Sequence, residues 1–390
     1  MTVAKVSAVE SLNLENLQET VRLPGPCVSL FLPPYHPGAQ AKSMAAILKT
    51  DLQEAARRLE SLKISESEAA ELLGPIEELS RDEQFLAGSQ WSWALYRAPG
   101  ILRQFELIAP VNAALTIGGC FQLRPILAEL HLPPEFYLLK LSKEGAELLR
   151  CAKLQAETVD WPKGVEETLI AALALDQPDH DLENRSPVGG SSGAARRVRF
   201  GTGTERETQH TYLSDYYKMV DRGVHELLNG TGAPLVLAGV DEDTVIYRMA
   251  NMYPNLMAAG VHGSFIKSMS GNDNRVLQQA YWIVRAYCTE KAAAHLKESR
   301  ERLSPARFSV HLDAILHSAM EGRVDRVYID ESAQRLGVFT DARQGERSNW
   351  GEEDLLNRAA VETIRQGGQA FALPNSRMPE GVAVAAILRY

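Results

Sequence analysis

The chain has 390 residues, of which 45% are hydrophobic and 23% are charged, and its formal net charge is −9. This composition is typical of a soluble globular protein with two or three domains, and the acidic balance excludes a broadly basic protein that coats nucleic acid. Four dispersed cysteines lack metal-ligand spacing and no apolar run reaches roughly 18 residues, so we expect a cytoplasmic protein without a metal, a cofactor or a membrane segment.

The first predicted domain, residues 1–131, mixes strands and helices. Cys27 to Leu32 is a short apolar run that prolines end, which predicts a strand. Apolar residues at helical spacing predict a helix over 44–62, and a capping box at Ser65 and Glu68 predicts the start of a second helix. Residues 91–96 and 101–107 flank a Pro-Gly turn and predict a hairpin.

The second predicted domain, residues 132–269, begins with strand patterns at 136–141, 146–150 and 156–159 and ends with strands at 234–239 and 261–266. Asp241, Glu242 and Asp243 follow the fourth of these strands. At the end of a strand in an open α/β sheet, such carboxylates could bind a metal in a nuclease. We favour the alternative that they begin a helix, where negative charge offsets the helix dipole.

A glycine-rich segment lies inside this second domain. Gly189, Gly190, Ser191, Ser192 and Gly193 are too small to pack a core, and they predict a flexible, exposed loop. Three arginines follow it and can hold phosphates. A long helix comes next, with Thr204 and Glu207 as a capping box and apolar residues at three- and four-residue steps up to 228.

The third predicted domain, residues 270–390, alternates helices and strands. We expect helices over 277–296, 308–320 and 355–364, and strands at 324–329, 336–340, 370–373 and 382–387. A literal Gly367-Gly368-Gln369 follows the last helix and precedes a strand. These glycines are explained as the end of the helix and a turn rather than as a catalytic loop.

The glycine loop with its arginines and helix resembles the central domain of archaeal and eukaryotic class I release factors, where a Gly-Gly-Gln loop enters the peptidyl-transferase centre. The terminal Ala-Ile-Leu-Arg-Tyr390 is similar to the last strand of release factors and of Pelota. On these residues the chain is identified as a member of a bacterial archaeo-eukaryotic release factor-like family. The matching residues of the central segment are Gly189, Gly190, Ala194, Ala195, Arg196, Arg197, Phe200, Glu207, His210, Tyr212 and Tyr217.

This resemblance implies three α/β domains, of which the central one is ribonuclease-H-like. The C-terminal one is then an α-β-α sandwich of the kink-turn-binding ribosomal-protein type. It also implies the ribosome, tRNA and rRNA as partners, and it leaves a translational GTPase open as another. The implied catalytic residues are Gly189, Gly190 and Ser191, and the implied RNA-binding residues are Arg185, Arg196, Arg197 and Arg199.

Ser191 stands where the release factors have their catalytic Gln, and three functions therefore stay open. In the first, the protein is a release or rescue factor, and backbone N–H groups near Gly190 position water or stabilise an oxyanion. In the second, it is a non-catalytic hibernation or regulatory factor that binds the ribosome or RNA. In the third, Ser191 or Ser192 is the nucleophile of an ester hydrolase, with His180 or His210 as base, although a flexible loop holds no preorganised triad.

Overall fold

The computed structural model describes residues 12–21, 26–35, 39–82, 91–152, 155–166, 168–175, 203–264, 274–338, 340–341, 346–347 and 351–390. The chain forms two compact units. Met1–Leu132 and Cys288–Tyr390 make up the larger one, and Pro133–Tyr287 makes up the smaller one. The division into three domains at 131/132 and 269/270 stays a prediction.

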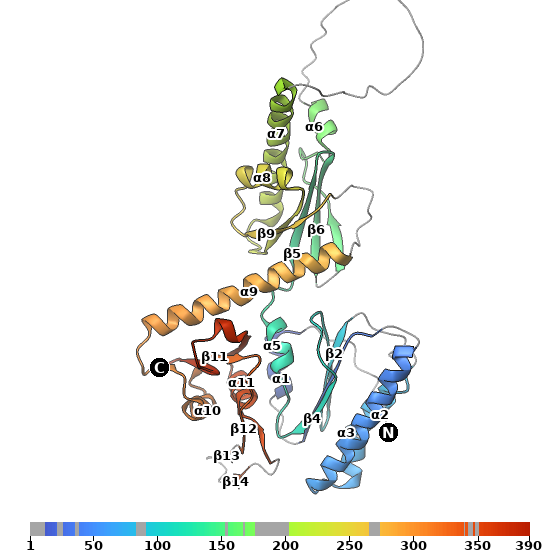
Figure 1. Ribbon diagram of the computed structural model, residues 1–390, viewed down its shortest axis with the longest axis vertical. Coiled ribbons are helices and arrows are strands. Elements are labelled where there is room, and N and C mark those ends of the chain that lie inside the picture. The colour runs from blue at the N-terminus through green and yellow to red at the C-terminus, as the bar shows by residue number, and fades with distance from the viewer. Residues whose placement is uncertain are drawn as a thin grey trace, which may run out of the picture. The chain divides into compact units, whose positions relative to one another are not determined.

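The smaller unit is built on one five-stranded sheet in the order β7-β6-β5-β8-β9 (Figure 1). The pairs β5/β6 and β6/β7 are antiparallel, whereas β5/β8 and β8/β9 are parallel. This mixed sheet confirms the α/β class and the ribonuclease-H-like layout. Its strands are β5 (Phe136–Ser142), β6 (Gly145–Ala152), β7 (Gln155–Val159), β8 (Leu235–Gly239) and β9 (Leu256–His262).

The last strand of this sheet was predicted at 261–266 and instead runs from Leu256 to His262. Only Met257 and Val261 are buried along it, because β9 lies at the edge of the sheet and leaves its small central residues exposed. The apolar signal is therefore weak where the strand begins. Residues 265 and 266 lie outside the described part of the chain.

In the described ranges, four helices belong wholly or partly to this unit, and α7 contributes most to the core of its sheet. Tyr217, Val220, Val224 and Leu228 of α7 are fully buried in one cluster with residues of β5, β6 and β8. At about 1.5–3 kcal/mol for each fully buried large apolar side chain, this face holds the helix on the sheet. The helices are α6 (Leu169–Leu175), α7 (Gly203–Leu228), α8 (Asp241–Ala250) and α9 (Asn274–Arg302), the last of which continues into the larger unit.

The first sheet of the larger unit is antiparallel throughout, in the order β3-β2-β1-β4. Its elements are β1 (Cys27–Leu32), β2 (Ser92–Ala98), β3 (Ile101–Leu107), β4 (Ala114–Gly118), α1 (Leu14–Val21), α2 (Ala39–Ser61), α3 (Glu66–Leu79) and α5 (Arg124–Leu130). Leu30 and Leu32 of β1 pack with α2 and α3, whereas Phe31 belongs to the core on the opposite face.

The predicted strand, helices and hairpin of this first sheet are confirmed. Ser65 Oγ accepts a hydrogen bond from the Glu68 N–H at 3.3 Å, and the Glu68 carboxylate accepts one from the Ser65 N–H at 3.1 Å, which completes the predicted capping box. The sequence patterns did not indicate α1, β4 or α5, which have only five to eight residues each.

The second sheet of the larger unit, in the order β10-β17-β11-β16, has helices on both faces (Figure 1). Ile315 and Ile364 pack in a core on one face, and Leu296 of α9 packs beside Tyr328 on the other. This arrangement confirms the predicted α-β-α sandwich. Its further elements are β10 (Phe308–Ser309), α10 (Leu312–Met320), β11 (Val324–Asp330), α11 (Leu355–Arg365), β16 (Gln369–Leu373), the short 3-10 helix η1 (Asn375–Arg377) and β17 (Val384–Leu388).

Two element predictions in this region are wrong. Phe308 was expected to begin a helix, but it pairs with Ile387 at the sheet edge, and the helix begins only after His311. The strand expected over 336–340 is divided because its two ends have different partners. Here β12 (Leu336–Gly337) pairs with β15 (Glu353–Asp354), and β13 (Thr340–Asp341) pairs with β14 (Glu346–Arg347).

One hydrophobic core joins the two sheets of the larger unit. Phe31, Tyr96 and Phe105 of the first sheet belong to the same buried cluster as Leu356 and Ile364 of α11. Residues that lie more than 200 positions apart in the chain are thus neighbours in this unit.

Candidate functional site

The residues that the sequence assigned to catalysis and RNA binding lie outside the described part of the chain. Gly189, Gly190, Ser191 and the arginines at 185, 196, 197 and 199 belong to residues 176–202, as do His180 and Ser192. The structure describes the two helices that flank this segment in the chain. The helix α6 ends at Leu175 directly before it, and α7 begins at Gly203 directly after it.

Two tyrosines of α7, and Trp161 from the loop after β7, form hydrogen bonds with the hairpin formed by β5 and β6. The Tyr216 hydroxyl accepts a hydrogen bond from the Ala146 N–H at 2.9 Å, and the Trp161 indole N–H donates to the Ala146 carbonyl at 3.3 Å. The Tyr217 hydroxyl donates to the Ser142 carbonyl at 3.4 Å. Because backbone groups are the partners, the two tyrosine bonds hold α7 to the sheet itself.

A close approach along α7 reinforces this attachment. A Cβ atom on Gly223 would lie 2.9 Å from Val165 Cγ2 and 3.2 Å from Trp161 Cε3. Only glycine lets the loop after β7 pack directly on the helix backbone at this point.

The helix α6 is tied to the same hairpin, at the turn between β5 and β6. The Leu169 N–H donates to the Glu144 carbonyl at 3.2 Å, and Thr168 forms an isolated β-bridge with Gly145. Thr168 Oγ1 also accepts a hydrogen bond from the Ala171 N–H at 3.1 Å, which caps the first turn. The segment 176–202 is thus attached at both ends to the rigid sheet of the smaller unit.

The three carboxylates after β8 lie in the first turn of α8, as the helix-start interpretation predicts. The N-cap residue is Val240, which makes no side-chain cap. Asp241 pairs with His262 at 2.7 Å, and Asp243 is buried with 2% of its surface exposed. Within the described ranges, no three His, Cys, Asp or Glu side chains converge where they could hold a metal ion.

Glu242 connects three elements of the unit. Its carboxylate lies 2.9 Å from Lys143 Nζ in the β5–β6 turn and 3.3 Å from His210 Nε2 on α7. The hydrogen bond and charge of Lys143 lower the pKa of Glu242 below its usual value, and His210 adds to this. His210, which the sequence offered as a base for a loop serine, is thus half-exposed and paired with an acid. No sequence pattern indicated Lys143, because a lone lysine in a turn resembles any other surface residue.

The literal Gly367-Gly368-Gln369 is structural, as predicted. Gly367 has φ of +78°, and the Gly367 and Gly368 N–H groups donate to the Ile364 and Thr363 carbonyls at 3.0 and 2.8 Å. Gln369 then begins β16 and pairs with Arg326. These bonds end α11 in the way that helix C-terminal glycines commonly do.

Residues 135–323 match the family described as Bacterial archaeo-eukaryotic release factor family 3. No curated protein matches the chain. In the described part of the chain, no helix is both long enough and apolar enough to cross a membrane.

Three solved structures resemble the chain at low identity. The archaeal translation termination factor aRF1 is 13% identical over 97% of this chain and 99% of that chain, with a TM-score of 0.26. Archaeoglobus fulgidus Pelota is 13% identical over 77% of this chain and 80% of its own, with a TM-score of 0.35. Dom34 from S. cerevisiae, a translation termination-like factor, is 11% identical over 75% of this chain and 74% of its own, with a TM-score of 0.33.

Proposed function

We propose that this chain, whose residues 135–323 match bacterial archaeo-eukaryotic release factor family 3, is a translation factor that acts on the ribosome. One observation carries the proposal. The family match includes the whole segment 176–202 together with both of its described attachments, α6 and α7. From this match and these attachments we infer that Gly189, Gly190 and Ser191 are directed at the tRNA end.

The chemistry of this segment favours binding over fast hydrolysis. Ser191 offers one hydroxyl on a single methylene, whereas the Gln of the release factors reaches several ångströms further. A misplacement of about 1 Å in a reacting group can cost on the order of a hundredfold in rate. We therefore infer a factor that occupies the ribosome and hydrolyses peptidyl-tRNA slowly. A translational GTPase as delivery partner and a cytoplasmic location belong to the same proposal.

The proposal is tested by measuring ribosome co-sedimentation and peptidyl-tRNA hydrolysis side by side. We expect the wild type to sediment with ribosomes, to hydrolyse peptidyl-tRNA slowly, and to gain hydrolysis in Ser191→Gln. Ser191→Ala is the matched control and should hydrolyse no faster than the wild type. Failure to sediment under any salt condition would refute the proposal, and ester hydrolysis without ribosomes that is lost in Ser191→Ala would favour a serine hydrolase.

The three arginines provide a second test. We expect the Arg196, Arg197 and Arg199 triple alanine variant to bind ribosomes more weakly, with a salt dependence shallower by about one unit for each phosphate that is no longer bound. Arg57, Arg81 and Arg302 are exposed and lie far from this segment in the chain, so their triple alanine variant removes the same charge as a control. Equal weakening in both variants would show that only net charge matters.

A further inference from the structure

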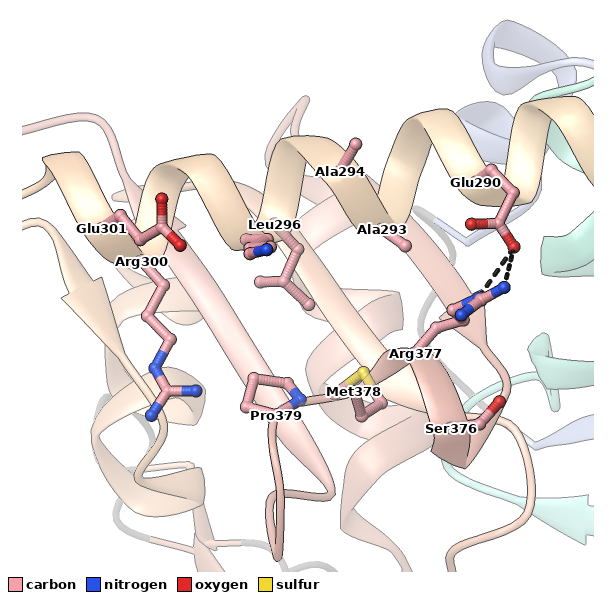
Figure 2. A pocket seen from close by; sticks show the side chains of 11 residues that line it. Glu290, Ala293, Ala294, Leu296, Arg300, Glu301, Ser376, Arg377, Met378 and Pro379 are labelled. Carbon is pink, nitrogen blue, oxygen red and sulfur yellow. Dashed lines mark hydrogen bonds and ion pairs between the residues drawn. The ribbon is translucent and has the colours of Figure 1, made fainter.

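A groove lies in the larger unit between the second half of α9 and the segment formed by η1 and the residues that follow it (Figure 2). Its volume is about 640 Å³, which is enough for a ligand of several residues. Ala293, Leu296, Met378 and Pro379 supply its apolar floor. Leu296 and Met378 also belong to a buried cluster beneath it, so the floor is anchored in the sheet.

An ion pair closes one end of this groove. Arg377 Nε and Nη2 lie 2.7 and 2.6 Å from the Glu290 carboxylate, as the dashed lines of Figure 2 show. Both contacts go to the same oxygen, Glu290 Oε1, and they hold the Arg377 side chain against α9. This arginine is therefore satisfied within the protein.

Two other cations line the groove and can meet a ligand. Lys297 and Arg300 are one turn apart on α9, and in the described part of the chain neither has a carboxylate within salt-bridge distance. Glu301 is the remaining charged residue of the lining. Beyond the closed ion pair, the groove thus carries two positive charges and one negative charge.

The lining defines the class of ligand. Among the residues that the structure describes, no aromatic ring lines the groove, so these residues offer no surface on which a nucleotide base could stack. An apolar floor flanked by two unpaired cations instead complements an apolar side chain with carboxylates beside it. We propose that this groove binds an extended acidic peptide segment of a partner protein, with a leucine-like side chain on the floor and carboxylates at Lys297 and Arg300.

Glu301 gives the bound segment a direction. It follows Arg300 in the chain, so the peptide residue that faces Glu301 should be neutral or basic. The acidic residues of the partner then lie opposite Lys297 and Arg300, on one side of that residue. This polarity distinguishes a peptide site from a general anion site, because inorganic phosphate has no such order.

Fluorescence anisotropy with defined probes tests the proposal on the full-length protein. The first probe is a fluorescein-labelled octapeptide in which glutamates and leucines alternate. The second replaces its glutamates with lysines, and the third replaces its leucines with serines. We expect only the first to bind with high affinity, and to bind more weakly as salt rises, because its charge contacts are exposed.

Four variants assign the binding to the groove. Lys297→Glu/Arg300→Glu reverses both cations and should weaken the first probe about tenfold or more. Ala294→Trp fills the groove from an exposed position and should have a similar effect. Lys291→Glu reverses one charge and Lys291→Trp introduces the same indole at an exposed α9 residue outside the lining, and both should bind like the wild type.

Three results would overturn the proposal. The first is equal binding of the glutamate and lysine probes, and the second is unchanged affinity in both groove variants with their folding intact by circular dichroism. In the third, a single-stranded RNA oligonucleotide binds and is lost in Lys297→Glu/Arg300→Glu while the glutamate probe does not bind. That result would assign the two cations to phosphate instead.

Discussion

The carboxyl group of Asp243 lies where its charged form is unfavourable. Its side chain is buried, and its Oδ1 has no hydrogen-bond partner within the described residues. Burial raises the pKa of Asp243, and the nearby Glu242 raises it further, whereas Lys143 and the Tyr217 hydroxyl act in the opposite direction. The net shift is upward, so the charged form is destabilised in the folded protein.

The sign of this shift predicts a pH dependence. Between the unfolded and folded pKa values the folded protein binds more protons, so the free energy of unfolding falls as pH rises through this window. We expect Asp243→Asn to remove that fall and to be more stable than the wild type at pH 7. At pH values below the unfolded pKa the two should differ least. Urea denaturation followed by tryptophan fluorescence from pH 3 to 7 checks this.

Asp221 is the matched control. It is also buried, and burial raises its pKa, but both of its oxygens accept hydrogen bonds, one from the Tyr247 hydroxyl at 3.0 Å and one from the Met252 N–H at 2.9 Å. Asp221→Asn loses one of these acceptors and should be destabilised by about 1 kcal/mol. If Asp243→Asn is destabilised at pH 7 to the same degree, the interactions of the Asp243 carboxylate with Tyr217 and Lys143 outweigh the cost of burying its charge.

Gly367 and Gly368 follow the end of α11, and each position requires glycine for a different physical reason. A Cβ on Gly368 would lie 2.6 Å from Thr363 Cγ2 and 2.7 Å from the Val324 carbonyl oxygen, whereas a Cβ on Gly367 meets nothing nearer than 3.5 Å. We expect Gly368→Ala to cost about 1–3 kcal/mol through overpacking. Gly367→Ala should cost about 1 kcal/mol through its positive φ alone.

Ribosome binding by the folded fraction of both glycine variants should equal that of the wild type, because this Gly-Gly-Gln ends α11. Loss of ribosome binding in Gly367→Ala without loss of folding would contradict the structural role. Thermal unfolding and co-sedimentation on the same samples distinguish these outcomes.

At the scale of elements, the attachment of α7 depends on a hydroxyl that periodicity does not reveal. Tyr216→Phe leaves the Ala146 N–H, which is otherwise buried, without its acceptor. We expect this variant to lose about 1–3 kcal/mol of unfolding free energy. Tyr212→Phe removes a hydroxyl from an exposed position on the same helix and should change nothing measurable. Equal stability of the two variants would show that packing alone holds α7.

Long, strongly periodic elements could be predicted from the sequence, and short or edge elements could not. The apolar spacing of α7 and α9 indicates a helix because one face is buried along many turns. In contrast, α5 has seven residues, and β4 has five residues of which one is buried. Neither segment is long enough to show a recognisable spacing of apolar residues. The hydrogen bonds that attach the candidate site could not be predicted from the sequence for another reason. Trp161, Ala146 and Tyr216 are distant in the chain and come together only when it folds.

At the scale of the whole molecule, polar contacts within the larger unit join residues about 230 positions apart. Asn357 Nδ2 donates to the Phe121 carbonyl at 2.8 Å, and its Oδ1 accepts from the Leu123 N–H at 2.7 Å. Arg124 pairs with the buried Asp354 at 2.6 Å. No local sequence pattern predicts such contacts, because each residue resembles an ordinary helix or loop residue until its partner is known.

These contacts, with the shared core, predict that the two sheets of the larger unit unfold together. Asn357→Ala leaves a buried carbonyl and a buried N–H without partners and should cost about 2–5 kcal/mol. Hydrogen exchange in the full-length protein should then speed up in β1, β2, β11 and β17 alike, since they lie around one core. The strands of the smaller unit, β5 and β8, bury their side chains in a separate cluster and should keep wild-type protection. Faster exchange confined to α11 and its own sheet would mean that the first sheet is stable by itself, and the prediction of three independently folding domains would then hold.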